Sequence, residues 1–204
     1  MPLLGSAKAE RRGTPADHLV IGLGNPGTEF AGTRHNVGVE VVEELARRSG
    51  TKLKRSKAKA LTGDATIGGK RVALALPQTF MNLSGESAAL LVRRYGIEDP
   101  ARMIIVHDEL DLPFAALRVK EGGGLAGHNG LRSLKQHLHT DEFVRVRIGV
   151  DKPPSKEHGA NHVLRRLSKA ERKELDVTVQ LAADAVETII ADGVAVAMNR
   201  FNGT

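Results

Sequence analysis

The chain has 204 residues, of which 41% are hydrophobic, and this is enough to form one domain with a sizeable core. Thirty Lys and Arg against 24 Asp and Glu give a formal net charge of +6 and a pI of about 9.8, so polyanions such as nucleic acids are reasonable partners. The absence of Cys excludes disulfides, thiolate nucleophiles and Cys-based metal sites.

No apolar run approaches the roughly 18 to 20 residues that a membrane-spanning helix needs, and the N-terminus lacks the apolar core of a signal peptide. We therefore expect a cytoplasmic protein with no membrane partner. One Tyr, five Phe and no Trp argue against an RNA-binding surface built from stacked aromatic rings, so any RNA contact would depend on charge and shape. A net charge of this modest size also fits a surface that only confers solubility.

The N-terminal residues 1–16 are small, charged and aperiodic, and we expect a flexible tail there followed by one catalytic domain over residues 17–204. The short apolar run His18–Leu23 ends in Gly and Pro, which predicts a buried strand that leads into a turn. Apolar residues at helical spacing then predict a helix over residues 36–48, with Gly50 after its end.

The next segment has the pattern of a β-hairpin followed by a helix. Two runs of β-forming residues, 59–67 and 70–76, flank Gly68-Gly69, and two glycines between such runs favour a tight turn. Helical spacing follows over residues 83–95, with Asn82 as a candidate N-cap and Gly96 as a C-terminal stop.

The second half of the chain begins with the apolar run 103–106, which predicts a central strand that delivers His107-Asp108-Glu109 to the edge of a sheet. The stretch 122–130 is too rich in glycine for a helix or strand, and leucines at helical spacing follow it. Residues 143–150 alternate apolar side chains with arginines, which is typical of a half-exposed strand. A long helix is predicted over residues 169–191, with a short apolar segment reaching residue 201.

Strands that alternate with helices along one chain predict an α/β fold. We therefore expect a single domain in which helices flank both faces of a twisted, mixed β-sheet. No internal repeat or low-complexity tract interrupts the pattern.

Residues 22–27, GLGNPG, match the dinucleotide-binding pattern G-x-G-x-x-G and follow a predicted strand. Pro26 has no N–H for a pyrophosphate, and the helical pattern opens only near His35 instead of within the glycine turn. The acidic residue expected about 20 positions later is also missing, because Glu43 and Glu44 belong to a helical pattern. We expect no nucleotide cofactor; an NAD(P)-dependent oxidoreductase stays an alternative that cofactor retained on purification would reveal.

Five polar residues lie at predicted strand ends, helix starts or the glycine loop: Asn25, His35, Asn82, Asp108 and Asn129. Taken singly, each has an ordinary structural explanation as a turn residue, a helix cap or a packed side chain. Taken together they indicate a site, because α/β sheets assemble their sites at these places. A His beside a carboxylate can take a proton from water near neutral pH, and amide groups can donate to a developing oxyanion.

Other hydrolytic centres find little support. The sequence contains no G-x-S-x-G, H-E-x-x-H or phosphate-binding P-loop motif. Two histidine pairs, His137 with His139 and His158 with His162, lack a carboxylate or Cys partner at metal-ligand spacing, and we interpret them as exposed polar residues. Water activated by His, with neither metal nor covalent intermediate, is the simplest chemistry that remains.

Five segments in chain order resemble the successive motifs of bacterial-type peptidyl-tRNA hydrolases, and the resemblance runs from about residue 17 to residue 202. They are GLGNPG at 22–27, TRHNVG at 33–38, PQTFMNLSG at 77–85, HDELDLP at 107–113 and GGLAGHNGLRS at 123–133. The resemblance implies a monomeric hydrolase that cleaves the ester between a peptide and the 3′ ribose of tRNA and so recycles tRNA during translation. It implies no cofactor and no metal.

Position by position, the resemblance makes His35 the catalytic base and Asp108 the carboxylate that holds it. Asn25 is implied to distinguish blocked from free aminoacyl groups near the first peptide bond of the substrate. Asn82 and Asn129 would bind the peptide and the 3′ CCA end, and Phe80 would line the same cleft.

Phe30 stands where family members commonly have Tyr, so its ring would still stack on the terminal adenosine but without a hydroxyl. Arg118 and Lys120, with Arg145 and Arg147 on the following strand, fit the family's basic clamp on acceptor-stem phosphates, which would bind without reading sequence. A solvated strand face is the alternative for these four cations.

A catalytically silent RNA-binding relative is the alternative for the chain as a whole. A protein of that kind has no physical need for both His35 and Asp108, so the pair favours an enzyme.

Overall fold

The computed structural model describes residues 14–153, 155 and 158–203. Most of the expected N-terminal tail therefore lies outside the described residues. Ala16, which we assigned to that tail, is buried, and its main-chain N–H donates to the carbonyl of Tyr95 at 3.1 Å. Arg102 donates to the carbonyl oxygens of Ala16 and Asp17. The packed part of the chain thus includes at least one residue more than we expected.

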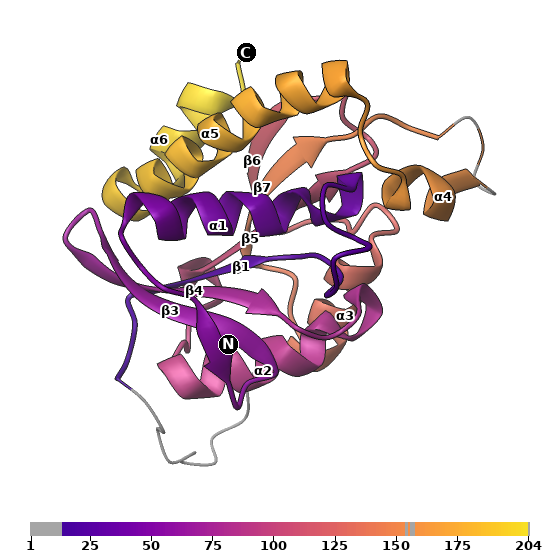
Figure 1. Cartoon of the computed structure of the whole chain (residues 1–204). Helices are drawn as coiled ribbons and strands as arrows, with labels where there is room; N and C mark the ends of the chain where they lie inside the picture. The colour runs from indigo at the N-terminus through magenta and orange to yellow at the C-terminus, as the bar shows by residue number, and fades with distance from the viewer. Residues whose placement is uncertain (1–13, 154, 156–157, 204) are drawn as a thin grey trace.

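Seven strands form one mixed sheet in the order β2-β3-β4-β1-β5-β7-β6 (Figure 1). The four central strands β4, β1, β5 and β7 are parallel, and the ladders toward both edges are antiparallel. The expected α/β fold with a mixed sheet is confirmed. The strands are β1 His18–Gly22, β2 Lys54–Ser56, β3 Ala60–Ile67, β4 Lys70–Pro77, β5 Met103–Glu109, β6 Leu117–Glu121 and β7 Val144–Gly149.

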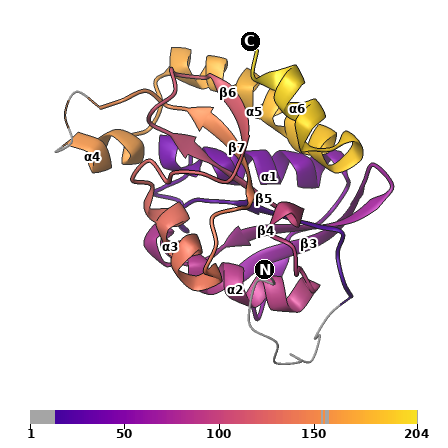
Figure 2. The ribbon, with the colours of Figure 1, turned by 180° about the vertical axis from the view of Figure 1, so that it is seen from behind.

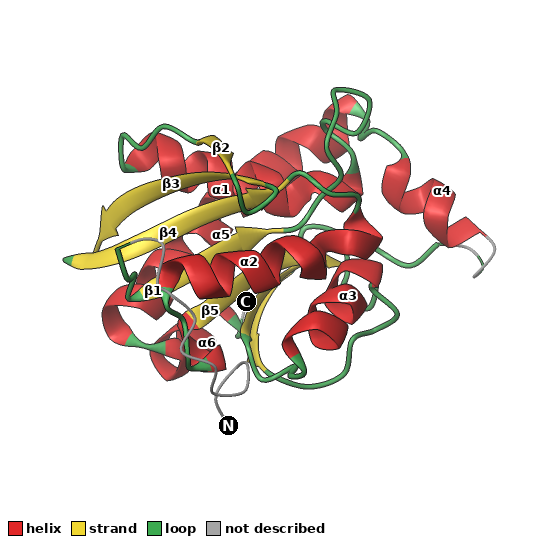
Figure 3. Ribbon diagram, turned by 90° about the horizontal axis from the view of Figure 1, so that it is seen from below, coloured by secondary structure: helices red, strands yellow, loops and turns green. Residues whose placement is uncertain are grey.

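Helices cover both faces of this sheet (Figures 1 and 2). On one face lie α1 (Val37–Arg48), α5 (Lys169–Asp192) and α6 (Val194–Phe201), and on the other lie α2 (Ser84–Tyr95) and α3 (Asn129–Leu138). The short helix α4 (Gly159–Leu164) stands apart, near the starts of α3 and α1 (Figure 3). Within the described ranges, no helix combines the length and the apolar character needed to cross a bilayer.

Most predicted elements are confirmed to within a few residues. The helix expected from residue 36 begins at Val37, after a single 3-10 turn at Arg34–Asn36, and the hairpin turns at Gly68-Gly69 as expected. Gly96 ends α2 in the left-handed conformation at φ 61°, which a glycine adopts without strain.

Two expectations about the elements are wrong, and two short edge strands were missed. Asn82 does not cap α2, because it lies within the 3-10 turn Met81–Leu83 and the N-cap position falls on Leu83. The short edge strands β2 and β6 were not predicted, because β2 has no apolar residue and the alternation of β6 rests on two apolar residues only, Leu117 and Val119. The alternating strand at 143–150 is not half-exposed, because Arg145 is buried at 1% exposure.

Close backbone contacts between α1 and the sheet explain two of the motif glycines. A Cβ at Gly22 would overlap the main-chain oxygen of Gly38, and a Cβ at Gly38 would overlap that of Val106. The start of α1 therefore packs directly against β1 and β5, and this contact holds the residues before α1 beside the end of β5. The helix begins well after the glycine turn, so this turn does not form a dinucleotide site at a helix N-terminus.

We predict that Gly38→Ala lowers the free energy of unfolding by about 1–3 kcal/mol, because the added methyl group must push α1 away from β1 and β5. Urea denaturation would measure the change. Gly203→Ala is the control, since a Cβ there has no neighbour within 4 Å and φ is not positive. Equal stabilities for the two variants would contradict the close-packing account.

Candidate active site

The site lies at the carboxyl edge of the parallel strands. From β1 the chain crosses to strands on one side, and from β5 it crosses to β7 on the other, so the topology reverses between β1 and β5. Open α/β sheets bind ligands at such switch points. Asn25 follows β1, Asp108 is the penultimate residue of β5, and His35 lies in the turn that precedes α1.

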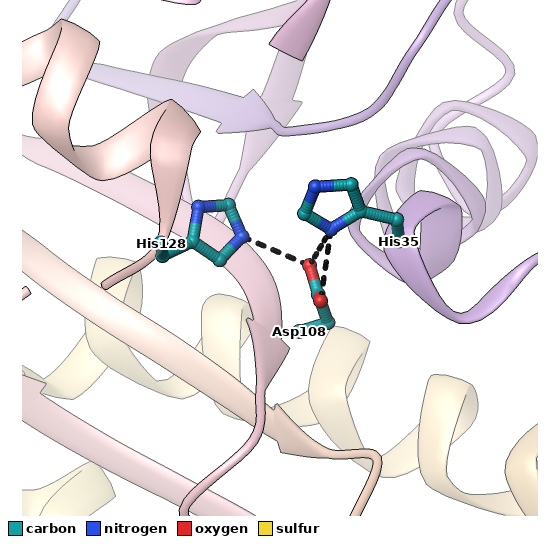
Figure 4. A group of neighbouring side chains, drawn as sticks. All are labelled: His35, Asp108 and His128. Atoms are coloured by element: carbon teal, nitrogen blue, oxygen red, sulfur yellow. Dashed lines mark hydrogen bonds and ion pairs between the residues drawn. The ribbon is translucent and has the colours of Figure 1, made fainter. Parts of the chain in front are cut away.

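The centre of the site is Asp108, whose carboxylate lies between two imidazole rings (Figure 4). Nδ1 of His35 is 2.8 and 2.9 Å from the two carboxylate oxygens, and Nε2 of His128 is 2.9 Å from Oδ1. The side chains are 11%, 2% and 7% exposed for His35, Asp108 and His128, so water reaches His35 most readily. The ring centroids of the two histidines are 5.0 Å apart.

The hydrogen bonds of His128 assign its tautomer. Its Nδ1 accepts from the main-chain N–H groups of Gly130 and Leu131 at 3.1 and 3.4 Å, so His128 is the N-cap of α3. An accepting Nδ1 carries no proton, and Nε2 must then carry the proton and donate it to Asp108. The same carboxylate accepts from Nδ1 of His35, which leaves Nε2 of His35 without a proton and able to act as a base.

The pKa values of the pair follow from this arrangement. Burial alone would lower the pKa of His35, but the adjacent Asp108 carboxylate outweighs burial and leaves that pKa above its ordinary value. Burial would raise the pKa of Asp108, yet His35 and His128 hold it below its ordinary range. Asp108 is therefore an anion throughout the neutral range and stabilises a proton on His35.

A third histidine packs behind the site. His107 is fully buried, its Nδ1–H donates to the main-chain oxygen of Asp108 at 2.7 Å, and its ring stands edge-on to that of His128. Burial, with a smaller contribution from His128, lowers the pKa of His107 to about 3. His107 therefore stays neutral and supports the strand end that presents Asp108.

Asn25 is held with its amide in a defined orientation. Its main chain exchanges two hydrogen bonds of 2.9 Å with the Asn36 side chain, and its Oδ1 accepts from the main-chain N–H of Met81 at 2.8 Å. Because a main-chain N–H can only donate, this hydrogen bond assigns which end of the Asn25 amide is the oxygen. The Nδ2 group of Asn25 donates to no residue in the described part of the chain and can donate to a ligand.

A cavity of about 210 Å³ opens beside the two rings of Figure 4. It is lined by His35, Asp108, His128 and Asn129 and, from α4, by Ala160 and Val163. The cavity therefore combines a buried carboxylate, a base and the amide group of Asn129 in a partly apolar hollow, which suits hydrolysis of a carboxylic ester or amide.

The chain matches the family model for peptidyl-tRNA hydrolase over residues 19–204. The chain belongs to the peptidyl-tRNA hydrolase family. It is 46% identical to the peptidyl-tRNA hydrolase of Alkaliphilus oremlandii, across 91% of this chain and all of that protein, and 50% identical to that of Leifsonia xyli, across 90% and 96%. The crystal structure of peptidyl-tRNA hydrolase from Acinetobacter baumannii superposes with a TM-score of 0.86 at 41% identity, across 91% of this chain and 94% of that one. The chain is accordingly a hydrolase, and its fold is that of the family.

The structure places the other residues expected for substrate binding in different surroundings. Asn129 is exposed and opens α3 at the cavity, whereas Asn82 is exposed in the turn that holds Asn25. Phe80 is 56% exposed, and its ring meets that of Phe30 edge-on at 6.4 Å. An exposed aromatic pair beside the turn offers a surface on which a base or an apolar side chain can stack.

The expected basic clamp is only partly available on the surface. Arg118 and Lys120 lie on the edge strand β6, half-buried, on the face opposite Leu117 and Val119. Arg145, which we grouped with them, instead donates to the carbonyl oxygens of residues 123, 124 and 141. These hydrogen bonds hold the glycine-rich loop in place. The assignment of Arg145 to phosphate binding is wrong, because a buried guanidinium with carbonyl partners cannot face an RNA.

His35, Asp108 and His128 also form the one described group of side chains that could hold a metal, with ligand atoms within 4.8 Å of one another. A divalent ion would have to displace the protons that His35 and His128 donate to Asp108, since these imidazole nitrogens bind metals only without their protons. The three side chains need no ion to account for their hydrogen bonds.

The sequence motifs drew attention to Asn129 and not to its neighbour His128. A His between a glycine loop and a predicted helix has the appearance of an ordinary cap, and in this protein it is a cap. One signal could have indicated that His128 also binds Asp108: it is a second imidazole, and it directly precedes Asn129, which was already assigned to the site.

We predict that His128→Ala lowers the free energy of unfolding by about 0.5–2 kcal/mol relative to His128→Asn, because Asn can still cap α3 and Ala cannot. Both variants lose the donor to Asp108, so their difference in urea denaturation isolates the cap. Equal stability for the two would show that the N–H groups of α3 find water or another acceptor instead.

We predict that Asp108→Asn lowers the pKa of His35 from above 6.5 to below it, because the attraction of the carboxylate disappears while burial remains. Titration of the imidazole resonances by NMR would measure both values. The exposed His139, at the far end of α3, is the internal control, and its resonances should have the same chemical shifts in the wild type and the variant. A rise in the pKa of His35 would contradict the account.

Proposed function

We propose that the chain hydrolyses the ester between the carboxyl group of a peptide and the 3′ ribose of tRNA, with water activated by His35. The observation that carries the proposal is that Nδ1 of His35 is bound to a buried carboxylate, while its Nε2 has no hydrogen-bond partner among the described residues and its ring lines a cavity. The family's name supplies the substrate, and the comparison with relatives of 46% to 50% identity over nine-tenths of the chain supports it.

In the proposed mechanism, Nε2 of His35 takes a proton from a water molecule as the water oxygen bonds to the ester carbonyl carbon. Asp108 stabilises the imidazolium that forms. The carbonyl oxygen becomes an oxyanion and accepts from an amide donor at the cavity, for which Asn129 is our candidate. The bond to the ribose oxygen then breaks, and the proton on Nε2 passes to that oxygen, so the enzyme returns to its starting state.

We propose that Asn25 selects blocked over free aminoacyl groups. Its Oδ1 is already bound by Met81, so it presents Nδ2–H to the substrate. An N-blocked substrate offers a carbonyl oxygen that can accept this hydrogen bond, whereas a free ammonium group would face one donor with another. We propose further that Asn82, Phe80 and Phe30 bind the peptide and the 3′ CCA end.

Arg118 and Lys120 are proposed to contact acceptor-stem phosphates. They lie on β6, two strands from β5, so their strand is about 10 Å from the one that carries Asp108. Phosphate contacts made by such side chains give affinity that falls with salt and carries little sequence information, which suits an enzyme that accepts many tRNAs.

The proposal predicts that His35→Ala lowers turnover of N-acetyl-aminoacyl-tRNA by about 100-fold to 10,000-fold while affinity for tRNA changes little, because only the base is lost. Asp108→Asn should also lower turnover, and Asp111→Asn in the same motif, on an exposed side chain paired with Lys152, is its control. Release of the blocked amino acid is measured beside the unblocked aminoacyl-tRNA and with EDTA present.

Release confined to the blocked ester, unaffected by EDTA and lost in His35→Ala, would support the proposal. A near-normal rate in His35→Ala would remove His35 from the role of base, and inhibition by EDTA would indicate metal-assisted hydrolysis. Binding of tRNA without any release would indicate a catalytically silent RNA-binding protein.

A further inference from the structure

A second basic surface lies at the edge of the sheet, away from His35 and Asp108. From Arg47 to Gly63 the sequence has seven Lys and Arg and no Asp or Glu, so this short stretch carries more positive charge than the net +6 of the whole chain. It contains the edge strand β2, which Figure 3 shows beyond β3 and far from α4.

Part of this charge is neutralised within the fold. Arg47 and Arg48 bind Glu44, Arg48 also binds Asp184 and Glu187, and Lys59 binds Glu86. The remaining four cations are exposed and make no ion pair or side-chain hydrogen bond with any residue in the described ranges: Lys52, Lys54, Arg55 and Lys57. Exposed cations held close together without counter-charges raise the local potential and attract polyanions.

These four side chains line a groove of about 810 Å³. The groove forms because β2 pairs with β3 over three residues only, so the outer edge of β3 from Gly63 onward faces the groove. Its single carboxylate, Asp64, is paired with Arg71 at 3.2 Å. Hydroxyl groups of Thr51, Thr62 and Thr66 add further hydrogen-bonding groups to the lining.

The opposite wall of the groove is the end of α2. Arg94 stacks over the ring of Tyr95, with its guanidinium carbon 5.5 Å from the ring centroid, and its Nε–H is buried without a partner among the described residues. The walls thus present five cations and one neutralised carboxylate.

We infer that this groove binds the phosphate backbone of the body of tRNA, at a stretch beyond the 3′ end. The choice of tRNA as the RNA rests on the proposed function. The groove follows β2, four strands from β5, so it is about 19 Å from the strand of Asp108 on one side, while Arg118 and Lys120 lie about 10 Å away on the other. The two basic surfaces therefore lie on opposite sides of the strand that carries Asp108, at distances that the body of an RNA with its 3′ end at His35 can span.

Contacts between lysines and phosphates carry no sequence information and need no fixed geometry. Long lysine side chains along an open groove are suited to such contacts. An anionic membrane would be attracted by the same charge. The groove is concave and also offers hydroxyl groups, which favours a ribose-phosphate chain over a flat lipid surface.

The test compares Lys52→Gln/Lys54→Gln with a chemically matched control, Lys169→Gln/Lys173→Gln, whose lysines are exposed on α5. Binding of deacylated full-length tRNA is measured by fluorescence anisotropy over a salt series. The slope of log Kobs against log salt concentration should become less negative by about 1.4 to 1.8 when two phosphate contacts are lost. The groove variant should also bind tRNA more weakly at every salt concentration used. The control double variant should keep the wild-type slope.

A short oligonucleotide that mimics only the CCA end separates the groove from the site, and its affinity should be the same for wild type and the groove variant. Equal slopes for the groove and control variants would overturn the inference, as would an equal loss of affinity for the short oligonucleotide. The inference would also be overturned if the groove variant lost binding to anionic lipid vesicles but bound tRNA as the wild type does.

Deacylated tRNA has no ester, so this experiment does not depend on hydrolysis. If the chain failed to hydrolyse peptidyl-tRNA but the slope changed as expected, the proposed reaction would fail and the groove would stand. Turnover of a minimal blocked ester on the CCA oligonucleotide should be unchanged in the groove variant, because none of its lysines lines the catalytic cavity.

Discussion

The carboxylate of Asp108 accepts hydrogen bonds from two imidazole rings, and the rest of the site depends on this one interaction. A buried anion is costly unless it is paired and hydrogen-bonded, and here the partners come from two different segments, the turn before α1 and the start of α3. The same hydrogen bonds that make burial of Asp108 tolerable also set the tautomers of both histidines. Stabilisation of the fold and activation of the base are therefore parts of a single arrangement.

Much of the architecture could be predicted because local patterns determine it. Helical spacing was sufficient for α1, α2 and α5, and the double glycine was sufficient for the hairpin of β3 and β4. The short strands β2 and β6 escaped prediction because β2 has no apolar residue and β6 has only two, which is too few to establish a period, so only the ladder with a neighbour identifies them as strands. Their existence is a property of tertiary structure.

The site residues that lie at the end of a strand or the start of a helix could be predicted from the sequence. Asn25, His35 and Asp108 lie where the pattern of strands and helices placed them, and the structure brings His35 and Asp108 into contact. His128 and Arg145 were the failures. The sequence pattern does not contain the distances that decide these two cases. It cannot show that the helix cap His128 also reaches a carboxylate, or that Arg145 faces the carbonyl groups of a loop and not solvent.

The direct contact of α1 with β1 and β5 separates the geometry of the site from the packing of the core side chains. Since the main chain at Gly38 rests on the main chain at Gly22 and Val106, no side chain separates the segment that carries His35 from the strand that carries Asp108. The spacing of base and carboxylate is thereby insulated from the drift of core side chains. Substitutions among the apolar side chains between the sheet and the outer helices leave this main-chain contact in place, and with it the distance on which proton transfer depends.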